Sequence, residues 1–177
     1  MKTNLVITVT CPDRPGIVER ITDVVVRHSA NWEDSRMARL GGHFAGIVMV
    51  SVARTDAQPL TQSLLMLGDT ETAITVKATR SDEPGPSVRH ALYHLHLMGA
   101  DHEGIVHKVS AHLAARGINV ESMETRLTRA PMSAAPLFHM DAIVSVPPGL
   151  SLGELDSSLQ QIGESLGVDI DVSTAES

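Results

Sequence analysis

The feature that most constrains the fold of this chain is an internal repeat with an offset of 88 residues. The segment 13–19, DRPGIVE, resembles the segment 101–107, DHEGIVH. The same offset pairs Asn31 with Asn119 and Glu33 with Glu121. Self-similarity at a fixed spacing indicates that one structural unit occurs twice, so the chain should fold as two small domains of the same design.

A Pro- and Gly-containing segment separates the two copies. Residues 81–87 combine charges, prolines and a glycine, a composition typical of a linker. We therefore predict a first domain over 1–80 and a second over 88–177. The segments 49–52 and 143–146 also match, now with an offset of 94, so the second copy carries about six extra residues. The Pro- and Ala-rich segment 130–136 is the expected place for this insertion.

Hydrophobic periodicity predicts the same order of elements in both copies. Apolar residues alternate in the strands and recur at helical spacing in the helices. Gly41-Gly42 is expected to form a two-residue hairpin turn, and Ser151 with Glu154 a helix capping box. Asp13 is expected to cap the first helix, with Pro15 in its first turn. The predicted strands span 4–10, 31–40, 43–54 and 72–79 in the first copy, and 88–98, 118–129, 137–146 and 168–172 in the second.

Each copy therefore reads strand, helix, strand, strand, helix, strand. This order predicts an α+β fold: two tandem ferredoxin-like domains, each an antiparallel sheet with both helices on one face.

Composition excludes several classes of function. The formal net charge is −7 and only 2% of residues are aromatic, which disfavours direct nucleic-acid binding and binding to anionic membranes. One cysteine permits no disulfide framework within the chain, and we find no signal peptide, so a cytoplasmic location is expected. No phosphate-binding loop or zinc-type spacing occurs, and we expect no cofactor.

The element order, together with the segment Asp13–Val18 and Asn31, resembles the ACT domain. Two such domains with a short linker and no attached enzyme resemble the glycine cleavage system transcriptional repressor family. The resemblance implies that an amino acid binds at an interface between paired domains, beside the turn joining the first strand to the first helix. By position, the implied ligand-binding residues are Cys11, Asp13, Arg14, Pro15, Gly16, Ile17 and the nearby Asn31 in the first copy, and Asp101, Gly104, Ile105 and Asn119 in the second.

The second copy departs from this pattern. His102 and Glu103 replace Arg14 and Pro15, so the turn loses its proline and gains a carboxylate near the place where an anion would bind. This copy is therefore expected to serve a structural role or to take a different ligand. Asn31 and Asn119 have an alternative role as residues that only satisfy backbone groups.

Three histidines on one strand and the single cysteine each have a structural explanation that is simpler than a chemical role. His90, His94 and His96 alternate along one strand and could contribute to a metal site, but the sequence names no third ligand. A polar sheet face or a domain interface explains them more simply, and no metal site is predicted. Cys11 lacks an evident base and orienting group, so a bystander thiol is the simpler reading.

The resulting hypothesis is a non-enzymatic regulator. It binds a small amino acid, with glycine inferred from the resemblance alone, and controls amino-acid metabolism or its transcription through a protein partner. A homodimer is expected. The alternatives are a structural or protein-interaction module with vestigial sites and an enzyme with an unrecognised site on the histidine face.

Overall fold

The computed structural model describes residues 1–79 and 90–175 of the chain. Two compact units are present, one up to Gly85 and the other from Pro86 onwards. The predicted linker 81–87 and the expected start of a strand at Val88 lie outside the described residues.

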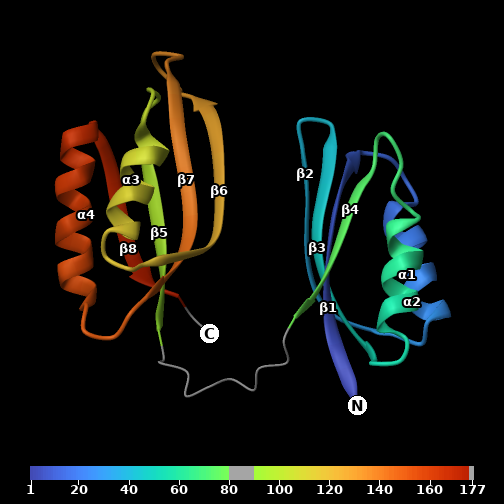
Figure 1. The fold of residues 1–177 in the computed structure, drawn as a ribbon. Helices are drawn as coiled ribbons and strands as arrows, with labels where there is room; N and C mark the ends of the chain where they lie inside the picture. Colours follow the sequence, from blue (N-terminus) through green and yellow to red (C-terminus); the bar gives the residue numbers. More distant parts are fainter. Residues whose placement is uncertain (80–89, 176–177) are drawn as a thin grey trace. The chain divides into compact units, whose positions relative to one another are not determined.

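The first unit contains four strands and two helices (Figure 1). Both helices cover one face of a sheet with strand order β2-β3-β1-β4, in which every neighbouring pair is antiparallel. The elements are β1 (Lys2–Pro12), α1 (Ile17–Arg27), β2 (Asn31–Leu40), β3 (His43–Ala53), α2 (Ala57–Leu65) and β4 (Ala73–Thr79).

The second unit repeats this topology, with strand order β6-β7-β5-β8. The predicted fold class is thus confirmed in both copies. Its elements are β5 (Ala91–Ala100), α3 (Ile105–Ala114), β6 (Asn119–Arg129), β7 (Pro136–Val146), α4 (Leu152–Leu166) and β8 (Val168–Thr174).

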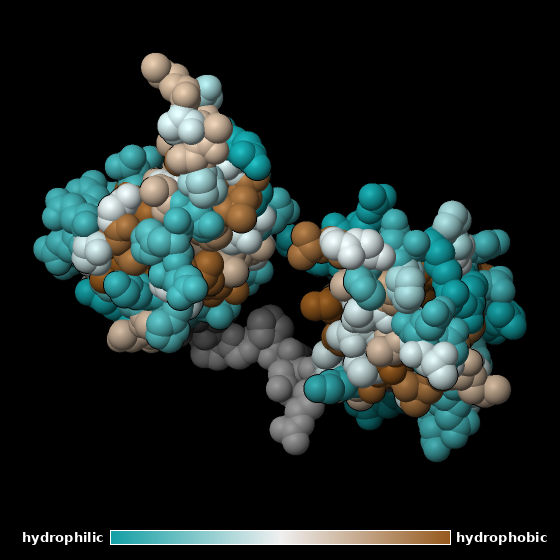
Figure 2. Space-filling model, turned by 90° about the horizontal axis from the view of Figure 1, so that it is seen from above, coloured by the Kyte–Doolittle hydropathy of each residue, from teal (hydrophilic) through white to brown (hydrophobic). Residues whose placement is uncertain are grey.

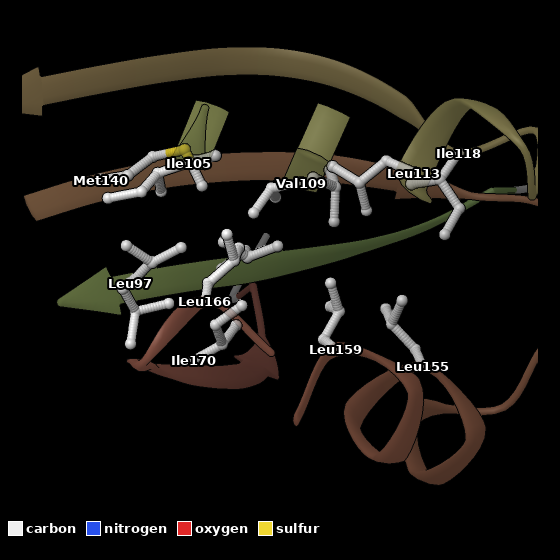
Figure 3. Packing of buried hydrophobic residues seen from close by; sticks show 14 of the residues in the cluster. Leu97, Ile105, Val109, Leu113, Ile118, Met140, Leu155, Leu159, Leu166 and Ile170 are labelled. Carbon is white, nitrogen blue, oxygen red and sulfur yellow. The ribbon is translucent and has the colours of Figure 1, made fainter. Parts of the chain in front are cut away.

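Each unit has its own hydrophobic core between sheet and helices. In the second unit Leu97 of β5, Val109 of α3 and Leu159 of α4 belong to one buried cluster between the sheet and the helices (Figure 3). In the first, Ile7, Ile21 and Leu60 occupy the equivalent layer from β1, α1 and α2. Burial of such side chains is the main driving force that holds helices to a sheet, at about 1.5–3 kcal/mol for each large aliphatic residue.

Local turn chemistry follows the sequence closely. Gly41 and Gly42 have φ angles of 57° and 80° and form the two-residue turn between β2 and β3. The Ser151–Glu154 capping box is present at the start of α4. The insertion lies between β6 and β7, because β6 ends at Arg129 and β7 begins at Pro136.

Exposed apolar residues are scattered over the described surface. On the face shown in Figure 2, hydrophilic side chains predominate and hydrophobic ones form small separate patches. No helix in the described residues is long and apolar enough to cross a membrane.

Candidate functional site

The turn between β1 and α1 presents the uncapped start of a helix. Gly16 is the N-cap residue, with φ of 91°, and no side chain accepts a hydrogen bond from the first N–H groups of α1. The prediction that Asp13 caps this helix is therefore wrong, and Pro15 precedes the helix instead of lying in its first turn. A left-handed glycine takes the cap position, which leaves the N–H groups and the positive end of the helix open.

Asp13 is held by the β2–β3 hairpin instead. Its backbone N–H donates to the Gly42 carbonyl at 2.9 Å, and its carboxylate lies 3.3 Å from the Arg39 guanidinium. The β2–β3 hairpin thus holds the turn in place, and the carboxylate of Asp13 stays at the surface.

Arg14 connects the turn to the segment between α2 and β4. Its guanidinium donates to the Thr72 hydroxyl at 3.3 Å and lies 3.6 Å from carboxylate oxygens of Asp69 and Glu71. Backbone N–H groups of Glu71 and Thr72 donate to Asp69 and hold the pKa of its carboxyl below the usual range, so Asp69 stays ionised. Charges of both signs therefore surround the open helix start.

A small pocket lies under the same turn. It is lined by Ile17 and Ile21 of α1, Leu67, the Arg20 side chain and the buried Thr72, and the strand residues Val9 and Ile74 complete it. Its volume is about 10 Å³, enough for about one water molecule. Any group entering here must be very small unless the turn moves.

Asn31 does not lie near this turn within its own unit. It pairs with Ser51, which in turn pairs with Asn4 near the start of β1, whereas the turn follows the end of β1. Cys11 lies seven residues after Asn4 along β1, which corresponds to about 23 Å. The expectation that Asn31 is close to the turn is wrong for a single unit: they lie at opposite ends of the sheet (Figure 1).

The Asn31 amide is engaged at its own end of the sheet. It donates to the Glu33 carboxylate at 2.9 Å, and the Ser51 hydroxyl donates to the same oxygen. These two hydrogen bonds lower the pKa of Glu33. In the second unit Asn119 donates to Glu121 at 3.1 Å, so the structure repeats the pair. The sequence repeat contained both glutamates, and it also paired Ser51 with Ser145, but it did not predict the hydrogen bonds that join these residues.

The corresponding turn of the second unit has the same backbone and different side chains. Gly104 has φ of 90° and is the uncapped N-cap of α3. The backbone N–H of Asp101 donates to the Pro136 carbonyl at 3.1 Å. His102 takes the place of Arg14 and contacts the carbonyl of Leu166, at the end of α4, at 2.8 Å. Ile105 is buried in the core, as Ile17 is in the first unit.

Comparison with known proteins agrees with this architecture. Residues 3–78 match the family model of the ACT domain. An unknown protein from Galdieria sulphuraria, of known crystal structure, is 34% identical, and the match covers 99% of this chain and 100% of that one with a TM-score of 0.86. The first unit is an ACT domain. The second unit repeats its strand order and its sequence pattern, so both are called ACT domains below, although the family model matches only the first.

Matches to named proteins extend over most or all of the chain. The glycine cleavage system transcriptional repressor of Escherichia coli K12 is 27% identical over 159 residues, which are 89% of this chain and 83% of that protein. A crystal structure of a candidate glycine cleavage system transcriptional repressor is 23% identical and covers 100% of this chain with a TM-score of 0.73, which shows the fold alone. The chain is thus an ACT-domain protein related to that repressor.

Cys11 is a core residue of the first ACT domain. Its side chain is 1% exposed, and burial raises the pKa of the thiol. The repeat places Gly99 at this position in the second ACT domain, where an added Cβ would lie 2.5 Å from a methyl carbon of Val168. The Cys11 side chain therefore fills core volume, and only its backbone could contribute to a surface site.

His94 and His96 lie on the face of the β5 sheet that points away from the helices, and His90, just before β5, contacts the Ser145 hydroxyl. Leu95 and Leu97 point into the core, as expected from the alternation, and His96 donates from Nδ1 to the Asp141 carboxylate at 2.6 Å. Arg126 contacts the same carboxylate at 3.0 Å, and these contacts lower the pKa of Asp141. Among residues 1–79 and 90–175, no three His, Cys, Asp or Glu side chains converge as metal ligands.

The sequence did not predict an open groove beside β8. The groove has a volume of about 620 Å³ and runs along the edge of the second ACT domain, between α4 and the sheet. Its lining is acidic, with Glu164, Asp169 and Asp171. Gly163 is one of the lining residues, and there α4 lies close to the backbone of β8, a tertiary feature without a local sequence signal.

Proposed function

We propose that this chain is a non-enzymatic regulatory protein that binds a small amino acid at the β1–α1 turn of its first ACT domain. The observation that carries the proposal is the start of α1. Its first N–H groups have no side-chain cap, and charged side chains of both signs lie on either side of it. The relationship to a glycine cleavage system transcriptional repressor supports a role in controlling amino-acid metabolism or its transcription, and supports glycine as the first effector to test.

The turn offers complementary groups for both ends of an amino acid. Free N–H groups and the partial positive charge of a helix N-terminus favour a carboxylate. The exposed carboxylates of Asp13, Asp69 and Glu71 are available to an ammonium group. Gly16 keeps the approach open, because its position carries no side chain. The small volume of the adjacent pocket favours an effector with little or no side chain.

The position of Asn31 favours a site shared between two ACT domains. Asn31 and the turn lie at opposite ends of one sheet, so one small ligand can touch both only if they come from different domains. We therefore propose that chains form homodimers in which Asn31 of one ACT domain approaches the turn of another.

A protein partner is the proposed recipient of the signal. A net charge of −7 opposes the phosphate contacts on which nucleic-acid affinity depends. Regulation of transcription by this chain would therefore proceed through another protein.

In the second ACT domain we assign a structural role to Asp101, Gly104, Ile105 and Asn119. His102 ties that turn to α4, and Glu103 adds a negative charge beside the helix start. Both changes make the turn a poorer receptor for a carboxylate.

A matched pair of glycine variants tests the proposal. Gly16→Ala and Gly104→Ala replace left-handed glycines with almost equal φ angles, and neither new methyl group meets a close neighbour. Each should therefore lose about 1 kcal/mol of stability for the same reason. Calorimetric titration and thermal shift with glycine, alanine and serine should give a response in the wild type and in Gly104→Ala, and a greatly weakened one in Gly16→Ala.

Three outcomes would count against the proposal. If no amino acid at millimolar concentration shifts the melting temperature or releases heat, the sensing role fails and an interaction module remains. If Gly104→Ala alone loses the response, the second turn is the receptor. Equal loss in both variants would make both turns receptors.

A further inference from the structure

Arg14 in the first ACT domain and His102, at the equivalent position in the second, have the same structural role. Each side chain reaches from the strand–helix turn to the chain at the end of the second helix of its domain. Arg14 reaches Thr72 and the carboxylates of Asp69 and Glu71. His102 reaches the carbonyl oxygen of Leu166, the last residue of α4.

The two contacts of His102 favour its doubly protonated form. Nε2 lies 2.8 Å from the Leu166 carbonyl oxygen, and Nδ1 lies 3.0 Å from the Glu103 carbonyl oxygen. A carbonyl oxygen can only accept, so both ring nitrogens must donate, and only imidazolium has two N–H groups. A neutral ring would keep one bond and set a nitrogen lone pair against the other oxygen.

The surroundings of the ring also favour the cation. The Leu166 carbonyl belongs to the last turn of α4, which has partial negative charge and lacks an intrahelical N–H partner. Asp101 on the same turn stabilises the charge, while Lys108 on α3 opposes it. The other ionisable groups on the turn, α4 and β8 are all acidic: Glu103, Glu154, Asp156, Glu164, Asp169 and Asp171. On α3, His107 and His112 accompany Lys108.

We propose that His102 is a proton-dependent latch that fastens the β5–α3 turn to the end of α4, whereas Arg14 fastens the first turn at every physiological pH. This inference goes beyond the proposed function, because it requires no effector. It makes the second ACT domain the pH-sensitive member of the pair.

The direction of the pH dependence follows from the hydrogen bonds. The carbonyls of Glu103 and then Leu166 raise the pKa of His102 above its ordinary value of 6.5. A group whose pKa is raised by folding contributes its full stabilisation below the unfolded pKa, and loses it as pH rises through the folded pKa. The latch is therefore closed in mildly acidic solution and opens as pH rises beyond 6.5.

NMR titration of the full-length protein between pH 5.5 and 8.5 tests the latch. The ring ¹⁵N shifts of His102 should report two protonated nitrogens at low pH and a midpoint above 6.5. The amides of Gly104 and Gly167 should shift with the same midpoint, because they flank the two ends of the latch. Amide protection of this region, corrected for intrinsic exchange, should fall over the same pH range.

Two variants isolate the effect. His102→Gln should remove the titration of the Gly104 and Gly167 amides, and the ratio of wild-type to variant protection should approach one at high pH. His107→Gln, at an exposed position on α3, should behave as the wild type. A His102 midpoint at or below 6.5, a singly protonated ring at pH 5.5, or turn amides that titrate equally in His102→Gln would overturn the proposal. The wild-type ring shifts decide the question even if the variant fails to fold.

Discussion

At the scale of single residues, the two ACT domains place different residues at the same left-handed position after their first helices. α1 is followed by Ser29, which has φ of 52°, and α3 by the equivalent Gly117, which has φ of 67°. The next residues close both helices in the same way: Ala30 donates to the Val25 carbonyl and Ile118 to the Leu113 carbonyl. Left-handed backbone costs a residue with a Cβ more than it costs glycine, so the first domain carries a strain that the second avoids.

Exchanging serine and glycine between these two positions measures this strain. We expect Ser29→Gly to raise the free energy of unfolding of the first domain by about 0.5–1 kcal/mol. Urea denaturation followed by fluorescence is suitable, because Trp32 is the only tryptophan and packs against the first core. Gly117→Ser should destabilise the second domain by a similar amount, since its new Cβ meets no neighbour. A stability loss in Ser29→Gly would show that the serine is not strained.

At the scale of elements, close approach of backbones shapes the second domain. α4 packs against β8 so tightly that a Cβ at Gly163 would lie 2.6 Å from the Val168 carbonyl oxygen. Gly153, in the first turn of the same helix, has open space around it. Substitutions at the two glycines therefore distinguish the effect of packing on stability from the effect of helix propensity.

Alanine at each position should have opposite effects. Gly163→Ala should lower the stability of the second domain by about 1–3 kcal/mol, because α4 must move away from β8. Gly153→Ala should raise it by up to about 1 kcal/mol, since alanine is the better helix former. Circular dichroism during chemical denaturation can follow both variants. A neutral Gly163→Ala would mean that α4 shifts freely along the sheet.

The sequence was most informative about the strands, helix starts and turns. Alternation predicted the strands, two glycines predicted the β2–β3 turn, and the Ser151–Glu154 pair predicted the capping box. The site was less predictable, because its geometry depends on non-local pairing. The chain places Asn31 soon after the turn, yet antiparallel pairing carries it to the other end of the sheet. Asp13 has the chemistry of a cap, but left-handed Gly16 takes the cap position and Arg39 engages the carboxylate.

At the scale of the whole molecule, one fold occurs twice with two differently constrained turns. The first has an open helix start among mixed charges, and in the second His102 bridges to α4. Relatives that match almost the full chain share both units, so the second copy belongs to the common architecture. We propose effector binding at the first turn and proton-dependent stabilisation at the second.

Backbone amide NMR during titration with glycine tests this division most directly. Addition of glycine to the ¹⁵N-labelled full-length protein at constant pH should shift the amides of Gly16, Ile17 and Val18 progressively until they saturate. The amides of Gly104 and Ile105 should stay in place. Saturable shifts at Gly104 and Ile105 with none at Gly16 would contradict the account.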